Sequence, residues 1–176
     1  MPQDASTSGT PLKVRRLNAK DIAGFRELRL EGLKNHPEAF GASWEDESAK
    51  PGVWWSERLE NNAIFGGWVG DSPLLGLAGF HATDALKRRH KGLLWGMYIR
   101  PAGRGTGLAA ALVQRVIEHA RPPVEEICLT VVTSNAAAHR LYSAAGFERY
   151  GLERRALKVG NEYYDEVLMA LRLQRP

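Results

Sequence analysis

A short glycine-rich run at residues 104–109 constrains the fold of this 176-residue chain more than any other stretch. An apolar segment, residues 93–99, leads into the run, and an amphipathic segment, residues 108–120, follows it. Strand, glycine-rich turn and helix in this order expose backbone N–H groups at a helix N-terminus, where the helix dipole carries partial positive charge. Gly105 and Gly107 permit positive φ and let an anion approach the backbone. The run therefore predicts a site for a phosphate or pyrophosphate group.

The composition is typical of a single soluble globular domain. Hydrophobic residues make up 44% and charged residues 25%, and no apolar run approaches the ~20 residues that span a bilayer. Residues 1–11 are rich in Ser, Thr, Gly and Pro, so we expect a flexible tail before one domain at residues 12–176. A single cysteine, Cys128, fits a reducing, cytoplasmic location. The net charge of +4 tolerates an anionic ligand and does not by itself point to nucleic acid.

The hydrophobic pattern predicts an α/β domain with a mixed sheet. Asp21 is expected to cap a first helix that ends at His36-Pro37, because a residue before proline avoids the helical region. A second helical region is interrupted at Pro51-Gly52. Ser134 or Asn135 is expected to cap a short alanine-rich helix that stops at Gly146. The strands are expected at residues 12–17, 64–69, 74–81, 92–99, 127–132, 147–158 and 163–173, and the two other helical regions at residues 44–61 and 105–120.

Two other phosphate motifs fit the glycine run less well. Residues 105–110 match the dinucleotide fingerprint G-x-G-x-x-A, but that motif normally follows the first strand of a fold, and several strands precede it here. The acidic residue expected at the end of the next strand is absent, since residues 132–134 are Val-Thr-Ser. A Walker loop is excluded because no Lys-Ser or Lys-Thr pair follows the glycines. Nicotinamide binding is therefore the least favoured interpretation.

A second segment, residues 129–147, carries a strand, then Asn135, then a helix with Leu141-Tyr142, then Gly146-Phe147. Together with the glycine run at a matching separation, this segment resembles the GNAT superfamily of acetyl-CoA-dependent N-acetyltransferases. The resemblance extends from about residue 14 to residue 173 and implies a GNAT-like single domain. Its central sheet is mixed and mostly antiparallel, with about seven strands splayed between the fourth and the fifth, and about four helices flank it.

The resemblance also implies how the site works. The pantetheine arm of acetyl-CoA would lie between the splayed strands, with Gly96 marking the bulge where they begin to separate. Tyr142 matches the family's general acid, which protonates the departing thiolate; a phenol keeps its proton at neutral pH and suits this role. The cofactor-binding residues implied are Met97, Ile99, Arg104, Gly105, Thr106, Gly107, Leu108, Ala109, Asn135, Ala138 and Tyr142.

The general base is harder to assign. An acceptor amine must lose a proton before it attacks the thioester. Some relatives place a glutamate on the strand before the phosphate loop, and residues 93–99 contain no acid. Glu31, Glu45 and Glu47 lie in the helical region expected to shape the acceptor site, and Glu31 and Glu47 are the catalytic candidates beside Tyr142. The alternative for each is a solvated surface carboxylate.

The remaining reactive side chains point to no second site. His81, His90 and His139 lack metal-ligand spacing, so no metal is expected. Cys128 lies within an apolar strand and is best interpreted as a small buried residue. The basic run at residues 87–91 is expected to be a solvated hairpin tip, with binding of an acidic partner or nucleic acid as the alternative.

We therefore expect an N-acetyltransferase that moves an acetyl group from acetyl-CoA to a primary amine of a small molecule, peptide or protein N-terminus. Direct transfer in a ternary complex is the mechanism that the resemblance implies. A non-catalytic acyl-CoA-binding regulator and a nucleic-acid-binding module that uses residues 87–91 are the alternatives. The segments that would choose the acceptor, residues 33–61 and the final hairpin, carry no recognisable motif. The final hairpin also offers an edge that could pair in a homodimer.

Overall fold

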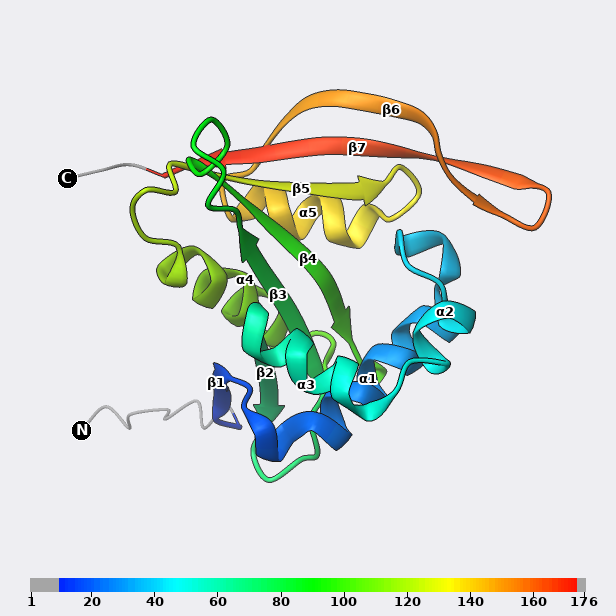
Figure 1. Cartoon of the computed structure of the whole chain (residues 1–176), viewed down its shortest axis with the longest axis vertical. Coiled ribbons are helices and arrows are strands. Elements are labelled where there is room, and N and C mark those ends of the chain that lie inside the picture. Colours follow the sequence, from blue (N-terminus) through cyan, green and yellow to red (C-terminus); the bar gives the residue numbers. More distant parts are fainter. Residues whose placement is uncertain (1–9, 174–176) are drawn as a thin grey trace, which may run out of the picture.

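The computed structural model describes residues 10–173, and within them seven strands form one sheet (Figure 1). The order across the sheet is β1-β2-β3-β4-β5-β7-β6, and every neighbouring pair is antiparallel except the parallel pair β4 and β5. The predicted mixed, mostly antiparallel sheet is therefore confirmed. The strands are β1 (Leu12–Arg16), β2 (Ala63–Val69), β3 (Gly76–Ala82), β4 (Lys91–Ile99), β5 (Glu126–Val132), β6 (Glu148–Val159) and β7 (Glu162–Arg172).

The helices follow the predicted order along the chain. Those of residues 10–173 are α1 (Ile22–Asn35), α2 (Trp44–Ser48), α3 (Gly52–Asn61), α4 (Leu108–His119) and α5 (Ala136–Ala144), with 3-10 turns η1 (Ala19–Asp21), η2 (Pro37–Ala39) and η3 (Pro101–Gly103). The helix predicted from residue 105 begins at Leu108, because Gly107 has φ +88° and lies outside the right-handed helical region. No helix in this described part combines the length and the hydropathy needed to cross a bilayer. The tail predicted at residues 1–11 falls almost entirely outside the described residues.

Two hydrophobic cores lie on opposite faces of the sheet. Helices α4 and α5 cover one face, and α1 and α3 cover the other. Glycines on β2 and β3 let α4 lie close to the sheet, since a Cβ at Gly67 would lie 2.6 Å from Leu108 and one at Gly76 would lie 2.7 Å from Leu112. Both leucines are fully buried. The close packing of these leucines against the sheet fixes the start of α4, and the glycine run lies at the N-terminus of this helix.

The start of α1 differs in detail from the prediction. Asp21 occupies the expected N-cap position, but its side chain makes no capping hydrogen bond to α1. Its carboxylate instead accepts hydrogen bonds of 2.7 and 2.8 Å from Arg15 and one of 2.9 Å from the Asn18 amide. Asn18 caps the preceding turn η1 through the Lys20 amide, at 3.0 Å. Asp21 therefore ties the end of β1 to α1, and the capping hydrogen bond belongs to Asn18.

A buried ion pair joins α2 to α1. Arg29 donates to both carboxylate oxygens of Glu47, at 2.9 and 2.8 Å, and both side chains are only 5% exposed. The guanidinium of Arg58, on α3, lies 3.7 Å from the same carboxylate. Removing one partner of such a pair leaves the other charge buried without compensation, which costs far more than the pair itself contributes. Glu47 therefore holds the three helices of this face together.

We expect Glu47→Gln to lower the free energy of unfolding by about 3–5 kcal/mol, because Arg29 would keep its charge without a carboxylate partner. Urea denaturation followed by far-UV circular dichroism measures this loss. Glu45→Gln is the matched control, since Glu45 is exposed on the same short helix and its replacement should change stability by less than about 0.5 kcal/mol. Equal stability of the two variants would show that the ion pair does not stabilise the fold.

Candidate active site

Strands β4 and β5 separate shortly after they meet. Their parallel pairing covers only Lys91–Leu93 against Glu126–Cys128. Further along β4 the register with β3 shifts, because Leu77 pairs with Tyr98 and Gly79 pairs with Trp95. Two residues, Gly96 and Met97, thus oppose a single residue of β3, and Gly96 has φ +66°. This is a β-bulge, which bends a strand and increases its twist. The bulge predicted at Gly96 and the splay predicted between the fourth and fifth strands are confirmed.

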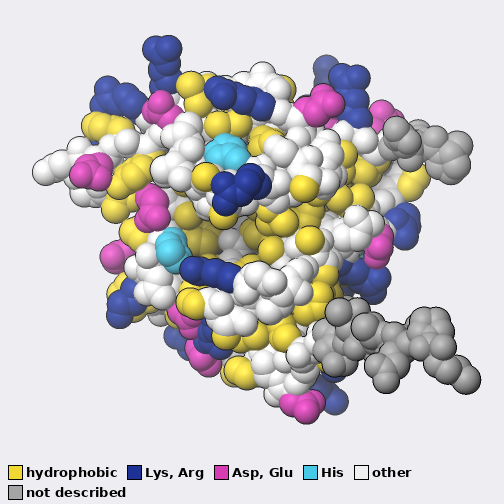
Figure 2. All heavy atoms as spheres, turned by 180° about the vertical axis from the view of Figure 1, so that it is seen from behind, with side chains coloured by type: hydrophobic (Ala, Val, Ile, Leu, Met, Phe, Trp, Pro, Cys, Tyr) yellow, Lys and Arg dark blue, Asp and Glu magenta, His cyan; other side chains and the backbone are white. Residues whose placement is uncertain are grey.

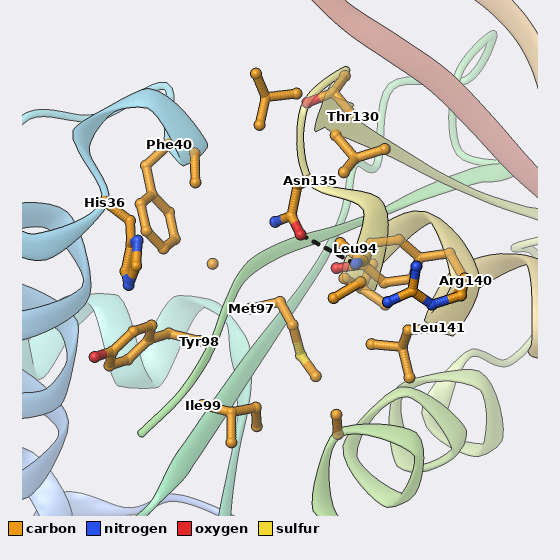
Figure 3. Close-up of a pocket in the computed structure, with 18 of the residues that line it drawn as sticks. His36, Phe40, Leu94, Met97, Tyr98, Ile99, Thr130, Asn135, Arg140 and Leu141 are labelled. Carbon is orange, nitrogen blue, oxygen red and sulfur yellow. Dashed lines mark hydrogen bonds between the residues drawn. The ribbon is translucent and has the colours of Figure 1, made fainter. Parts of the chain in front are cut away.

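A cavity of about 790 Å³ occupies the space between the separated strands. Residues 94–99 of β4 and 130–132 of β5 form two of its walls, and it reaches the glycine run at one end and residues 36–40 at the other. Figure 3 shows His36, Phe40 and Tyr98 on one side of this space and Asn135, Arg140 and Leu141 on the other. On the surface in Figure 2 the molecule is hollowed near the middle of one face, with hydrophobic side chains in the hollow. The size suits a cofactor or drug-sized ligand.

The glycine run forms an anion cradle at one end of the cavity. Gly105 has φ +74°, and a Cβ built there meets no atom within 4 Å. The amides of Gly105, Thr106, Gly107 and Ala109 have no backbone acceptor among the described residues. These donors lie at the N-terminus of the 12-residue helix α4, whose dipole favours negative charge. The arrangement fits a pyrophosphate group, as the sequence predicts.

Not every residue of the run is free to contact a ligand through its side chain. The Thr106 hydroxyl donates to the Gly103 carbonyl at 2.7 Å and accepts from the Leu108 amide at 3.3 Å. Leu108 is fully buried in the core. Arg104 donates from Nε to the Ile99 carbonyl at 3.1 Å. Of the predicted cofactor-binding residues, the cavity is lined by Met97, Ile99, Arg104, Gly105, Ala109, Asn135, Ala138 and Tyr142, and not by Thr106, Gly107 or Leu108.

Tyr142 lies on α5 and lines the cavity from the face covered by α4 and α5. Its side chain is only 5% exposed and its ring packs edge-on against Phe147, with ring centroids 5.8 Å apart. Among residues 10–173 its hydroxyl has no hydrogen-bond partner. Burial raises the pKa of Tyr142 well above that of an exposed phenol, so the hydroxyl keeps its proton at physiological pH. A protonated, unpartnered hydroxyl at this place can donate a proton into the cavity.

Asn135 fixes the start of α5. Its Oδ1 accepts from the Ala138 amide at 3.1 Å and so caps the helix. The helix ends before Gly146, which has φ +94° as its predicted role as a helix terminator requires. Asn135 is therefore the helix cap, as expected of Ser134 or Asn135. Its position on the cavity wall leaves its amide group available for a ligand as well.

The structure places the two carboxylates expected as bases, Glu31 and Glu47, in ion pairs outside the cavity lining. Glu31 accepts from the Tyr98 hydroxyl at 3.0 Å and from Arg100 Nε at 2.8 Å. The hydrogen bond from Arg100 holds the pKa of Glu31 below its usual value. Glu47 is enclosed with Arg29, as described above. Each carboxylate can therefore affect the cavity only through the side chains with which it forms hydrogen bonds.

The end of the cavity away from the glycine run contains two side chains that the sequence did not single out for chemistry, His36 and Glu38. His36 follows α1, and its amide donates to the Gly32 carbonyl at 3.0 Å. Its Nδ1 lies 3.8 Å from a carboxylate oxygen of Glu38. Both belong to residues 33–61, which were expected to shape the acceptor site, but no spacing pattern distinguishes them.

The other residues considered from the sequence lie away from the cavity. Cys128 is partly buried, and burial raises the pKa of its thiol, so the reactive thiolate is disfavoured. Residues 87–90 form the exposed turn between β3 and β4, and Lys91 pairs with Glu126 at 2.8 Å. In the part of the chain that the structure describes, no three His, Cys, Asp or Glu side chains are arranged to hold a metal ion.

Comparisons with known proteins agree with this geometry. A profile of the acetyltransferase (GNAT) family matches residues 29–147. A 61-residue stretch is 39% identical to the N-alpha-acetyltransferase RimI of Mycobacterium tuberculosis, over 35% of this chain and 37% of that relative. The match therefore spans little more than a third of the curated relative.

Solved structures extend the likeness to nearly the full chain. The structure of yncA from Salmonella typhimurium with its cofactor acetyl-CoA has a TM-score of 0.76 at 20% identity, over 94% of this chain and 96% of that one. The ribosomal-protein-S18-alanine N-acetyltransferase from Escherichia coli has a TM-score of 0.70 at 20% identity, with the same coverage of 94% and 96%. At such identities the likeness establishes the fold. The family profile matches more than half of the chain, and the chain therefore belongs to the GNAT family of acetyltransferases.

Proposed function

We propose that this protein transfers an acetyl group from acetyl-CoA to a primary amine of a small molecule, a peptide or a protein N-terminus. One observation carries the proposal: a single cavity runs through the β4–β5 splay and is lined both by residues of the glycine run and by Tyr142. The names of the relatives support its two halves. The solved yncA structure holds acetyl-CoA. RimI is named as an N-alpha-acetyltransferase, and the Escherichia coli enzyme as a ribosomal-protein-S18-alanine N-acetyltransferase.

The donor would bind along the strand edge that the splay leaves open. Beyond Leu93, β4 has no pairing with β5, so its polar groups on that side can hydrogen-bond an extended ligand as a neighbouring strand would. Met97 and Ile99 are the residues proposed to do so, and Asn135 and Ala138 also line the cavity. The free amides of the glycine run would hold the pyrophosphate.

Transfer would be direct, with the acceptor and the donor bound together. The neutral amine forms a bond to the acetyl carbon, the carbon–sulfur bond breaks, and Tyr142 gives its hydroxyl proton to the departing sulfur. Because burial raises the pKa of Tyr142, the tyrosine holds its proton until the thiolate forms, and the proton that the acceptor nitrogen loses as the amide forms replaces it.

The proposal is tested by measuring release of CoA thiol from acetyl-CoA with pooled amines, comprising amino acids, polyamines, aminoglycosides and short peptides. Release with one pool supports the enzyme class and identifies the acceptor chemistry. Binding of acetyl-CoA by calorimetry without any release would favour a non-catalytic regulator. Absence of both would refute the proposal, and salt-dependent DNA or RNA binding in a gel shift would then favour the nucleic-acid alternative.

We expect Tyr142→Phe to lower kcat by about 10²–10⁴-fold, the usual contribution of a general acid, with less than about twofold change in the Kd for acetyl-CoA. Because the hydroxyl has no hydrogen-bond partner among the described residues, its removal should leave the fold intact, and a thermal melt checks this. Steady-state kinetics and calorimetry provide the two readouts. Tyr150→Phe is the control, since Tyr150 is 60% exposed on β6. Unchanged kcat in the Tyr142 variant would remove this residue as the acid.

Gly105→Val should weaken acetyl-CoA binding by at least about tenfold, because a β-branched residue disfavours the positive φ that aligns the free amides. Gly160→Val is a matched control. Gly160 lies in the β6–β7 turn with φ +59°, and a Cβ there also meets nothing within 4 Å. Both variants carry similar backbone strain, so calorimetry with acetyl-CoA isolates the effect of the cradle. Equal Kd values in the two variants would mean that the cradle does not hold the cofactor.

A further inference from the structure

The cavity itself limits which side chain can take the proton from the acceptor amine. Its titratable lining residues, taken over the described part of the chain, are His36, Glu38, Tyr98, Arg104, Arg140 and Tyr142. Arginines stay protonated in proteins, and the pKa values of both tyrosines are raised by burial, so they donate rather than accept near neutral pH. His36 and Glu38 are therefore the two proton acceptors available, and they stand next to each other.

We propose that His36 is the general base of the acetyl transfer and that Glu38 is a positioning residue that holds its ring. The inference rests on the function proposed above and names a group that neither the sequence motifs nor the family likeness assigns. Of the two side-chain types, imidazole is the one that enzymes use most often as a general base. The neighbouring carboxylate stabilises the imidazolium that forms, as the third member of a nucleophile–base–acid arrangement does.

The surroundings of His36 support this role. Its Nδ1 faces Glu38 Oε1 at 3.8 Å, which leaves Nε2 for the acceptor. The side chain of His36 is 41% exposed, so its proton can leave to water after each turnover. Its ring lies against that of Tyr98, with centroids 5.9 Å apart and planes inclined at 49°. Figure 3 shows the two rings together, with Phe40 beside His36, on the wall opposite Asn135 and Leu141.

Tyr98 is itself held in place from two sides. Its ring packs on α1 where Gly32 has no side chain, since a Cβ there would lie 3.0 Å from the ring. Its hydroxyl donates to Glu31 at 3.0 Å, and Glu31 accepts from Arg100 at 2.8 Å. Glu31 thus acts on the cavity through Tyr98, as a positioning residue two contacts away from the base. Glu38 also has a neighbour on β7, Tyr164: the hydrogen bond of this tyrosine to Glu162 raises its pKa most, and the charge of Glu38 adds to the rise.

The proton balance follows from these positions. The acceptor arrives as R–NH₃⁺ and gives one proton to the neutral ring of His36. The freed lone pair forms the nitrogen–carbon bond, the carbon–sulfur bond breaks, and Tyr142 protonates the sulfur. The second proton that the nitrogen loses as the amide forms returns through water to Tyr142, and His36 releases its proton to solvent. Base and acid therefore work from opposite walls of the cavity.

The test compares His36→Gln, Glu31→Gln and the exposed-site control His81→Gln, using acetyl-CoA and an alanine-initiated peptide whose acceptance is first checked with the wild-type protein. We expect His36→Gln to lower kcat at pH 7 by about 10²-fold with an unchanged Kd for acetyl-CoA. The acid limb of its kcat/KM profile should move up toward the pKa of a free α-amine, about 7.7–8.0. His81→Gln should match the wild type. Glu31→Gln should lower kcat by less than about tenfold and keep the acid limb of the wild-type pH profile.

Two further results separate the outcomes. Glu38→Gln should lower kcat by about 3–10-fold, and the double variant with His36→Gln should be no slower than His36→Gln alone, because the two residues act as a unit. An unchanged kcat and acid limb in His36→Gln would overturn the proposal, and loss of the limb in Glu31→Gln instead would assign the base to Glu31. A wild-type protein that binds acetyl-CoA but acetylates none of the pooled amines would refute the proposed function, and this inference with it.

Discussion

The separation of β4 from β5 is the structural feature on which the site depends. Two parallel strands normally pair along their length, but here the pairing stops at Leu93. The bulge at Gly96 bends β4 away, and the Arg29 guanidinium lies 3.3 Å from where a Cβ of residue 96 would be. Glycine is thus favoured at residue 96 for two reasons: the backbone has a φ of +66°, and a Cβ would crowd the Arg29 guanidinium. The opened edge of β4 supplies hydrogen-bonding groups that a closed sheet would have consumed.

The splay also connects two faces that a sheet normally keeps apart. Tyr142 and the glycine run belong to the face covered by α4 and α5, whereas His36 and Glu38 come from the end of α1 on the other face. Figure 1 shows β4 and β5 diverging, and in the proposed function a donor bound on one face and an acceptor entering from the other would meet between them. This geometry suits direct transfer, because both substrates reach the same point without crossing paths. It also explains why the proposed acid and base stand on opposite walls.

Local sequence patterns predicted the elements well, and they predicted where the residues of the proposed donor half lie on those elements. The glycine run, Asn135, Tyr142 and Gly146 each perform a role set by nearby residues: a turn, a cap, a helix face and a helix end. The carboxylates were different, since their roles depend on partners far away in the chain. Glu47 is paired with Arg29, 18 residues away, and Glu31 with Arg100, 69 residues away. A single sequence without these contacts does not distinguish a buried ion pair from a free surface acid.

The same reasoning shows why His36 could not be singled out from the sequence. Its position before Pro37 is sufficiently explained as the end of α1, and the sequence contains four other histidines. What sets it apart is the path of η2, which carries Glu38 back toward it and places both on the cavity wall. Tyr98 and Gly32 fix the level of α1 against β4, and so decide how far His36 reaches into the splay. The proposed acceptor half of the site is thus a product of helix packing, whereas the proposed donor half follows from local turns and caps that the sequence itself specifies.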